Sequence, residues 1–221
     1  MSLDIVPFTG TSRTWDALQS LLESDGTAAH PLANRLAGTL VPLRDLADSI
    51  HFLCMLHGRH PGVIDHAIAH SAKNAAGEWA IAAAEAFAVE RTYLVRLVAA
   101  AGPLPSTPGQ AACDIAVEGQ RHTLDMLAQS DRNGCAAGAA IALALDWTRI
   151  RSILHVAGER LGVAAPPTLL PPIAETATIV SALAREPAVE RAMMFGARQL
   201  LAQHYGLWGL LEARASARPD Y

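Results

Sequence analysis

Four ionisable residues occur in stretches of sequence that are otherwise almost apolar: His57, Glu85, Asp146 and His204. A buried carboxylate needs a cation, a hydrogen-bond network or a proton, because an unpaired buried charge is very costly. Each of the four lies on or beside the apolar face of a different predicted helix. Two imidazoles and two carboxylates from four helices are a ligand set for a transition metal in a bundle core, with iron or manganese as the candidate cofactor.

A structural role is the alternative for the same residues. His57 and His204 would then be neutral core histidines that hydrogen-bond to backbone or water, and Asp146 would pair with Arg149 or Arg151 on its own helix. We expect Asp146 to be buried in the central helix and held by an arginine, most simply Arg149.

A purely structural role explains Glu85 less well than it explains the other three residues. The side chains next to it are alanines and one valine, Val89, which offer no polar partner. We therefore expect Glu85 to be buried and paired with a cation or a hydrogen-bond donor from another helix. Glu118 and His122 are four residues apart and share a helix face, but their neighbours are charged, so this pair indicates a solvated surface.

The composition excludes several classes of protein. The chain has 221 residues and a formal net charge of −4, and 17% of its residues are charged, so it lacks the basic excess of a nucleic-acid-binding protein. Three dispersed cysteines without a C-x-x-C pair indicate reduced thiols, and the N-terminus lacks the pattern of a signal peptide. The longest uncharged apolar run, residues 134–145, is too short to cross a bilayer. We expect a cytoplasmic protein with no membrane or nucleic-acid partner.

Apolar residues recur mainly at three- and four-residue spacing, which predicts an all-α fold. The whole chain, 1–221, is expected to form one domain, with residues 1–30 as an N-terminal arm and residues 163–174, which contain four prolines, as an extended connector. Prolines and glycines at the ends of the periodic segments set the helix limits. The predicted helices span residues 14–24, 42–58, 61–76, 78–101, 108–130, 134–161, 176–185 and 187–215, with a kink or break at Gly77.

The order of these helices and three short segments resemble an uncharacterised bacterial family of ferritin-like helical bundles, over residues 40–215. The segments are LADSIHFL at 46–53, AAEAFAVE at 83–90 and QLLAQH at 199–204. The resemblance implies an up-down bundle with extra N-terminal and C-terminal helices. Di-iron members of that class use Glu on two helices and a Glu-x-x-His pair on the other two. In this chain no Glu is followed three residues later by His.

Three functions therefore follow from the sequence. The first is a non-catalytic binding or structural homodimer, in which an apolar strip on the last helix (Met194, Leu201, Trp208 and Leu210) is in excess of what one core covers. The second is an iron- or manganese-dependent redox enzyme that uses the four residues named above. The third is a small-molecule sensor that binds an apolar ligand near Trp79 or Trp147.

Overall fold

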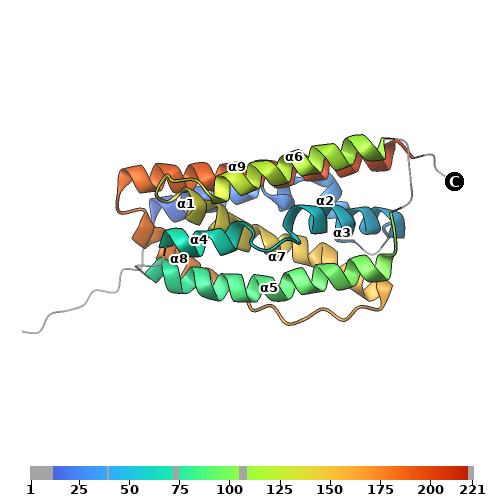
Figure 1. Cartoon of the computed structure of the whole chain (residues 1–221), viewed down its shortest axis with the longest axis horizontal. Coiled ribbons are helices and arrows are strands. Elements are labelled where there is room, and N and C mark those ends of the chain that lie inside the picture. Colours follow the sequence, from blue (N-terminus) through green and yellow to red (C-terminus); the bar gives the residue numbers. More distant parts are fainter. Residues whose placement is uncertain (1–11, 39, 72–74, 105–108, 219–221) are drawn as a thin grey trace, which may run out of the picture.

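The computed structural model describes residues 12–38, 40–71, 75–104 and 109–218. Over these residues the chain forms nine α-helices, one short 3-10 helix and no β-strand, so the predicted all-α fold is confirmed (Figure 1). The elements are α1 (Arg13–Asp25), η1 (Thr27–Ala29), α2 (Pro31–Leu36), α3 (Leu43–His57), α4 (Val63–Ser71), α5 (Ala75–Ala101), α6 (Gln110–Ala128), α7 (Cys135–Leu161), α8 (Ile173–Leu183) and α9 (Pro187–Ser216).

Most helix limits lie within a few residues of those expected. The limits of α7 agree closely because a glycine with positive φ flanks each end: Gly134 (φ 94°) and Gly162 (φ 68°). Two expectations were wrong. The helix expected from residue 78 already includes Gly77, since α5 begins at Ala75, and η1 and α2 were not predicted. Residues 72–74, where a helix was expected to continue, lie outside the described residues.

The central element is α7, as predicted from its apolar start. Residues 134–144 are all buried, and α7 contacts α3, α4, α5, α6 and α9. Its approach to α9 is very close: a Cβ added at Gly138 would lie 2.0 Å from the Met193 carbonyl oxygen, and one at Gly196 would lie 2.1 Å from the Cys135 carbonyl oxygen. These two glycines therefore set the distance between the helices that carry Asp146 and His204.

The described part of the predicted N-terminal arm packs onto the bundle. Helix α1 contacts α8 and α9, where it buries Trp15 and Leu18. Thr14 Oγ1 donates a hydrogen bond of 2.6 Å to Glu190 Oε1 of α9. Residues 26–30 then turn back along α7 and α9, which brings Thr27 into the core at 0% exposure.

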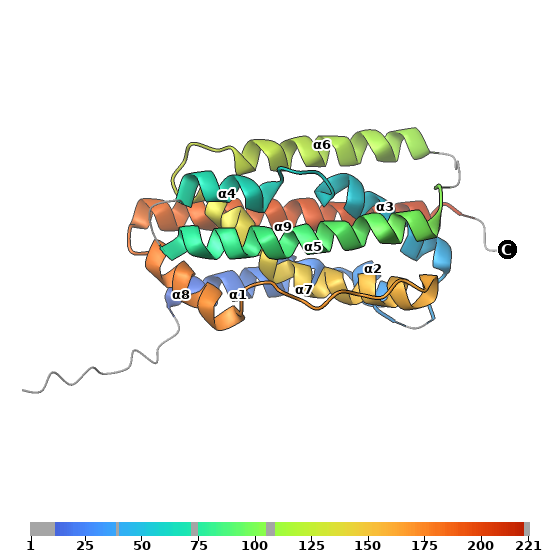
Figure 2. The ribbon, with the colours of Figure 1, turned by 60° about the horizontal axis from the view of Figure 1, so that its bottom comes forward.

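The Pro-rich connector has no helix from residue 163 to residue 172 and runs along the outside of the long helices (Figures 1 and 2). Arg151 of α7 fixes it, because its guanidinium donates to the Pro166 carbonyl oxygen as well as to Glu90 of α5. The connector forms no helix in which its backbone groups could bond to one another, and the Arg151 side chain supplies a hydrogen bond to one of its carbonyl groups instead.

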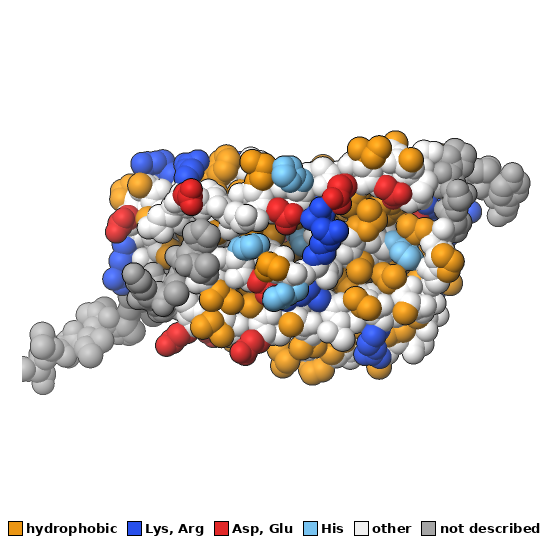
Figure 3. Space-filling model, in the orientation of Figure 1, with side chains coloured by type: hydrophobic (Ala, Val, Ile, Leu, Met, Phe, Trp, Pro, Cys, Tyr) orange, Lys and Arg blue, Asp and Glu red, His pale blue; other side chains and the backbone are white. Residues whose placement is uncertain are grey.

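One hydrophobic cluster includes side chains from all nine α-helices. Most of the apolar strip of the last helix belongs to it: Leu201 and Trp208 are 0% exposed, and Met194 and Leu210 are half-buried. The strip is therefore not left over for a partner, because α1, η1 and α7 cover it. On the outer face shown in Figure 3, apolar, acidic, basic and His side chains are interspersed.

None of the described helices is long and apolar enough to cross a membrane. All three cysteines are free thiols, and Cys135 is buried at the start of α7.

Candidate functional site

Three side chains from three helices form a buried hydrogen-bonded row, which we call the relay row: Asp146 of α7, His204 of α9 and His57 of α3. His204 Nδ1 lies 2.6 Å from Asp146 Oδ2, and His204 Nε2 lies 2.9 Å from His57 Nε2. The residues are 4%, 0% and 5% exposed, respectively. Each ring nitrogen of His204 therefore has one partner, a carboxylate on one edge and an imidazole on the other.

Thr27 completes the binding of the carboxylate. Its backbone N–H donates to Asp146 Oδ1 (2.8 Å) and its hydroxyl donates to Asp146 Oδ2 (2.6 Å). Trp208 Nε1–H in turn donates to Thr27 Oγ1 (3.0 Å). Gly26 allows this close approach, because a Cβ at that position would lie 2.9 Å from Asp146 Oδ1.

The predicted burial of Asp146 is confirmed, but the prediction that an arginine holds it was wrong. Arg149 lies three residues further along α7, and its Nη2 donates to Asn34 Oδ1 (2.6 Å) and not to the carboxylate. His204 and Thr27 supply the donors instead. The partners are 58 and 119 residues away in sequence, so no local pattern within α7 reveals them.

The surroundings hold Asp146 ionised and His57 neutral. Burial raises the pKa of the Asp146 carboxyl, but the hydrogen bond and charge of His204 and the two hydrogen bonds from Thr27 outweigh burial, so this pKa lies below its usual value. Burial is also the main reason why the pKa of His57 lies well below its usual range, and the neighbouring His204 and Arg91 lower it further. His57 is therefore a neutral imidazole at neutral pH.

Aromatic rings enclose His57. Trp147 and Phe87 meet its ring edge-on, with centroids 5.6 and 6.3 Å away. Trp147 also links the relay row to a second buried carboxylate, because its Nε1–H donates to Glu90 Oε2 (3.1 Å). Burial raises the pKa of Glu90, and Trp147 and Arg151 oppose that effect. Arg151 is the ion-pair partner of Glu90.

The prediction that Glu85 is buried was wrong, since Glu85 is exposed on α5 and Glu90 takes the buried position. Five residues of α-helix turn a side chain by about 140°, so the two carboxylates lie on different faces of α5. Alanine is tolerated both in a core and at a surface, and the run of alanines around Glu85 therefore gave no sign of which face is inside.

The four predicted metal ligands are thus only partly brought together. His57, Asp146 and His204 meet, but as a row in which Asp146 and His57 lie on opposite edges of the His204 ring, so they do not point at one common position. Glu85 lies outside the row. Among the described residues no group of three or more His, Cys, Asp and Glu side chains is arranged to hold a metal ion. In this arrangement the relay row is a hydrogen-bonded chain.

His57 lies beside a small hollow where α3 ends and α4 begins, which we call the α3–α4 hollow. Its volume is about 10 Å³, the space for one water molecule. Asp65 fixes the turn, because it accepts hydrogen bonds from Gly62 N–H (2.7 Å) and from both Nη atoms of Arg91. The hollow is lined by Leu56, His57, Arg59, Pro61, Gly62, Val63, Phe87, Arg121, Leu124 and Asp125.

Asp146, at the other end of the relay row, lies beside a larger opening of about 490 Å³, which we call the α1–α7 groove. Its wall combines apolar side chains with polar ones of both charges, including Arg149 and Glu23. The lining is Gln19, Leu22, Glu23, Ala28, Leu145, Asp146, Thr148, Arg149, Ser152 and Ile173. The relay row therefore lies between the α3–α4 hollow and the α1–α7 groove.

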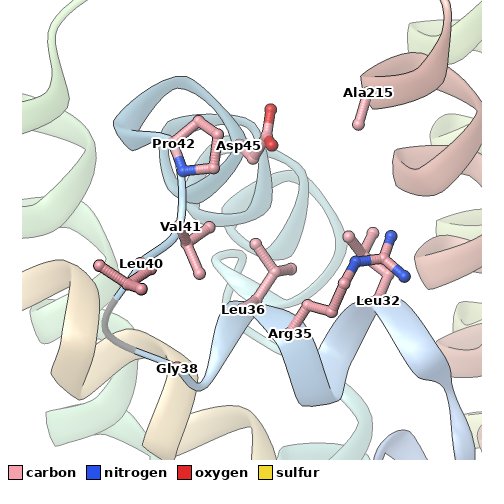
Figure 4. Close-up of a pocket in the computed structure, with 9 residues that line it drawn as sticks. All are labelled: Leu32, Arg35, Leu36, Gly38, Leu40, Val41, Pro42, Asp45 and Ala215. Carbon is pink, nitrogen blue, oxygen red and sulfur yellow. The ribbon is translucent and has the colours of Figure 1, made fainter.

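A further groove, of about 400 Å³, lies between α2, the turn after it, the start of α3 and the end of α9 (Figure 4). Its lining is mainly apolar and includes Leu32, Leu36 and Val41, with Arg35 and Asp45 as the charged members. It shares no lining residue with the relay row, so it is a separate surface feature.

Sequence reasoning missed two residues of this site, Thr27 and Glu90. Glu90 had a weak signal, because it is the last residue of the AAEAFAVE segment and is followed by Arg91. Thr27 follows the glycine that ends α1, and nothing in its neighbours distinguishes it from an ordinary turn residue. Its role depends on a contact across the bundle that only the tertiary structure shows.

The fold and the site together define an all-α helical bundle with a buried carboxylate–imidazole–imidazole row. The chain belongs to a family of unknown function, DUF6975, whose model matches residues 22–219. No curated protein and no solved structure matches the chain. The matched region contains Thr27 and all three residues of the relay row.

Proposed function

We propose that the protein is a non-catalytic binding protein that holds a small molecule in the α1–α7 groove. The observation that carries the proposal is the position of Asp146. A buried, ionised carboxylate, held by three hydrogen bonds from Thr27 and His204, forms part of the wall of a groove of about 490 Å³. Small-molecule sites in proteins are usually of this size, with a mainly apolar wall and a few fixed polar groups.

The lining favours a small zwitterion of the amino-acid type with an apolar side chain. The Arg149 guanidinium suits a carboxylate, and its orientation is fixed by the bond to Asn34. Glu23 supplies a carboxylate for an ammonium group, and Leu22, Leu145 and Ile173 supply apolar contacts.

The same geometry argues against chemistry on such a ligand. Both oxygens of Asp146 already accept hydrogen bonds from Thr27 or His204, so the carboxylate is committed to the core and does not serve as a free base. The sensor alternative has less support: the indole N–H groups of Trp79 and Trp147 are satisfied by Thr176 and Glu90, and both rings are enclosed by the core.

Titration calorimetry with free amino acids tests the proposal. We expect saturable binding of at least one amino acid with an apolar side chain. Arg149→Gln removes a charge-assisted contact and should weaken binding about ten- to hundredfold. Arg96→Gln, at an exposed position of α5 outside the groove, should bind like the wild type. The absence of heat for every amino acid at millimolar concentration would overturn the proposal.

We also propose a ferritin-like arrangement of the helices and a homodimer, both of which the sequence led us to expect. A ferritin-like arrangement is supported by the long aligned helices α5, α6, α7 and α9 (Figures 1 and 2). A homodimer no longer draws support from the apolar strip of α9, because the chain itself covers most of that strip. Support for it comes from exposed apolar side chains on α6, and its test is given below.

A further inference from the structure

We propose that the relay row is a proton-binding site in which a proton enters at His57, from the α3–α4 hollow, and its charge comes to rest on His204 beside Asp146. The inference is independent of any ligand in the α1–α7 groove. It rests on the unbroken line of contacts from Asp146 Oδ2 to His204 Nδ1 (2.6 Å) and from His204 Nε2 to His57 Nε2 (2.9 Å).

The hydrogen-bond pattern fixes the starting state. The Asp146 carboxylate accepts, so the proton of neutral His204 is on Nδ1, and His204 Nε2 is then an acceptor. The facing nitrogen, His57 Nε2, must therefore carry a proton and donate it. This leaves His57 Nδ1 as an unprotonated nitrogen with a free lone pair.

His57 Nδ1 is the point at which a proton enters. No described residue bonds to it, and it is not one of the fully enclosed polar atoms that lack a partner. His57 also lies in the wall of the α3–α4 hollow, which has room for one water molecule. We therefore place the entry of the proton at this nitrogen, by way of a water molecule in the hollow.

Proton uptake at His57 moves one proton from His57 to His204. A solvent proton forms a bond to His57 Nδ1, the Nε2–H bond of His57 breaks, and that proton forms a bond to His204 Nε2. His57 ends as a neutral ring protonated on Nδ1, and His204 ends as an imidazolium between Asp146 and His57. The hydrogen bond between the two rings reverses its direction, and the row gains one positive charge.

The charges around the row favour this final state over one with the charge on His57. His204 is bonded directly to a carboxylate, whereas the nearest charge on α5 that acts on His57 is the cation Arg91. Arg91 is itself paired with Asp65 of α4. The other charged side chains near His57 also form opposed pairs: Arg121 with Asp125 of α6, and Arg151 of α7 with Glu90, which Trp147 separates from the ring. The lining residue Arg59 adds a further cation. His57 therefore passes the proton on and stays neutral.

Nitrogen-15 NMR of the histidine rings in the whole protein, from pH 8 to pH 4, tests the inference. His57 should be protonated on Nε2 at high pH and on Nδ1 at low pH, without passing through an imidazolium, while His204 becomes doubly protonated. The two changes should share one midpoint. His155, which is exposed on α7 and lies outside the relay row, is the internal control for signal changes that are not specific to the row.

The variant Asp146→Asn provides a second test, which needs only the tautomers of His204 and His57 at pH 8. The new amide donates to His204 Nδ1, so His204 must carry its proton on Nε2 and His57 must be protonated on Nδ1 even at pH 8. A wild-type His57 that keeps its Nε2 proton while His204 becomes charged would overturn the inference, as would a His57 that itself becomes an imidazolium first. Because both arms use the free protein, they are unaffected if the groove binds no amino acid.

Discussion

The Asp146 carboxylate is costly to bury, but the core supplies it with hydrogen-bond donors. It accepts three hydrogen bonds at 2.8 Å or less, from Thr27 and His204, and these partners offset the loss of water. Replacement of such a network by apolar side chains is often neutral or stabilising, so stability alone gives little reason for it. This is why we assign a function to the relay row.

The pH dependence of stability is the prediction at the residue scale. In the unfolded chain His57 binds a proton with a pKa near 6.5. In the folded chain burial lowers this pKa well below its usual range, so His57 stays neutral. Below about pH 6.5 the unfolded state therefore binds more protons, and the free energy of unfolding must fall as the pH falls. We expect a loss of about 1–2 kcal/mol between pH 6.5 and 5.

Urea unfolding at a series of pH values checks this expectation. His57→Gln removes the site and should flatten the curve in that window. His155→Gln, at an exposed position of α7 outside the relay row, is the matched histidine control. The Asp146 contribution lies lower: its pKa is below the unfolded value, so its stabilisation is lost only as the pH falls below about 4. Parallel curves for wild type and His57→Gln would refute the assignment.

At the scale of elements, α7 and α9 decide whether the relay row can form, because they carry Asp146 and His204. The two helices meet where Gly138 and Gly196 each face a backbone carbonyl of the other helix at a distance that excludes a Cβ. Because these two glycines allow α7 and α9 to approach closely, the side chains of Asp146 and His204 can lie 2.6 Å apart.

Gly196→Ala is the prediction at this scale. The added methyl group would lie 2.1 Å from the Cys135 carbonyl oxygen, so α7 and α9 must move apart, at a cost of about 1–3 kcal/mol in the free energy of unfolding. Gly119→Ala is the matched control, since a Cβ there meets nothing within 4 Å and alanine favours the helix by up to about 1 kcal/mol. Chemical denaturation compares the two, and equal stability of both variants would contradict the tight-contact argument.

The same scale separates what the sequence predicts from what it does not. Helix limits follow from local chemistry, such as Pro187 at the start of α9 and Gly162 at the end of α7. The apolar stripe of α9 also placed His204 inward. Contacts between helices depend on how each helix is rotated about its axis and on how closely two helices approach. Periodicity specifies neither, so the pairing of Asp146 with His204 and Thr27 was missed. On Ala-rich α5 even the buried face was misjudged.

At the scale of the whole molecule, the surface that could pair two copies is on α6, which lies at the edge of the bundle (Figure 2). Its outer face exposes Ile115 (73%) and Met126 (65%). They are eleven residues apart, about three helical turns, and therefore lie on the same side of α6. Two copies of such a face can cover each other by two-fold pairing.

The last prediction is a homodimer through this face of α6. Light scattering across a tenfold dilution series should give a mass above that of the 23.3 kDa chain, falling toward it on dilution. Ile115→Glu places a charge in the pairing face and should give the monomer mass throughout. Ile81→Glu, at an apolar position of α5 that is 47% exposed, is the control and should behave like the wild type. A wild-type mass that stays at the monomer value eliminates the dimer, and a dimer that survives Ile115→Glu excludes α6 as its interface.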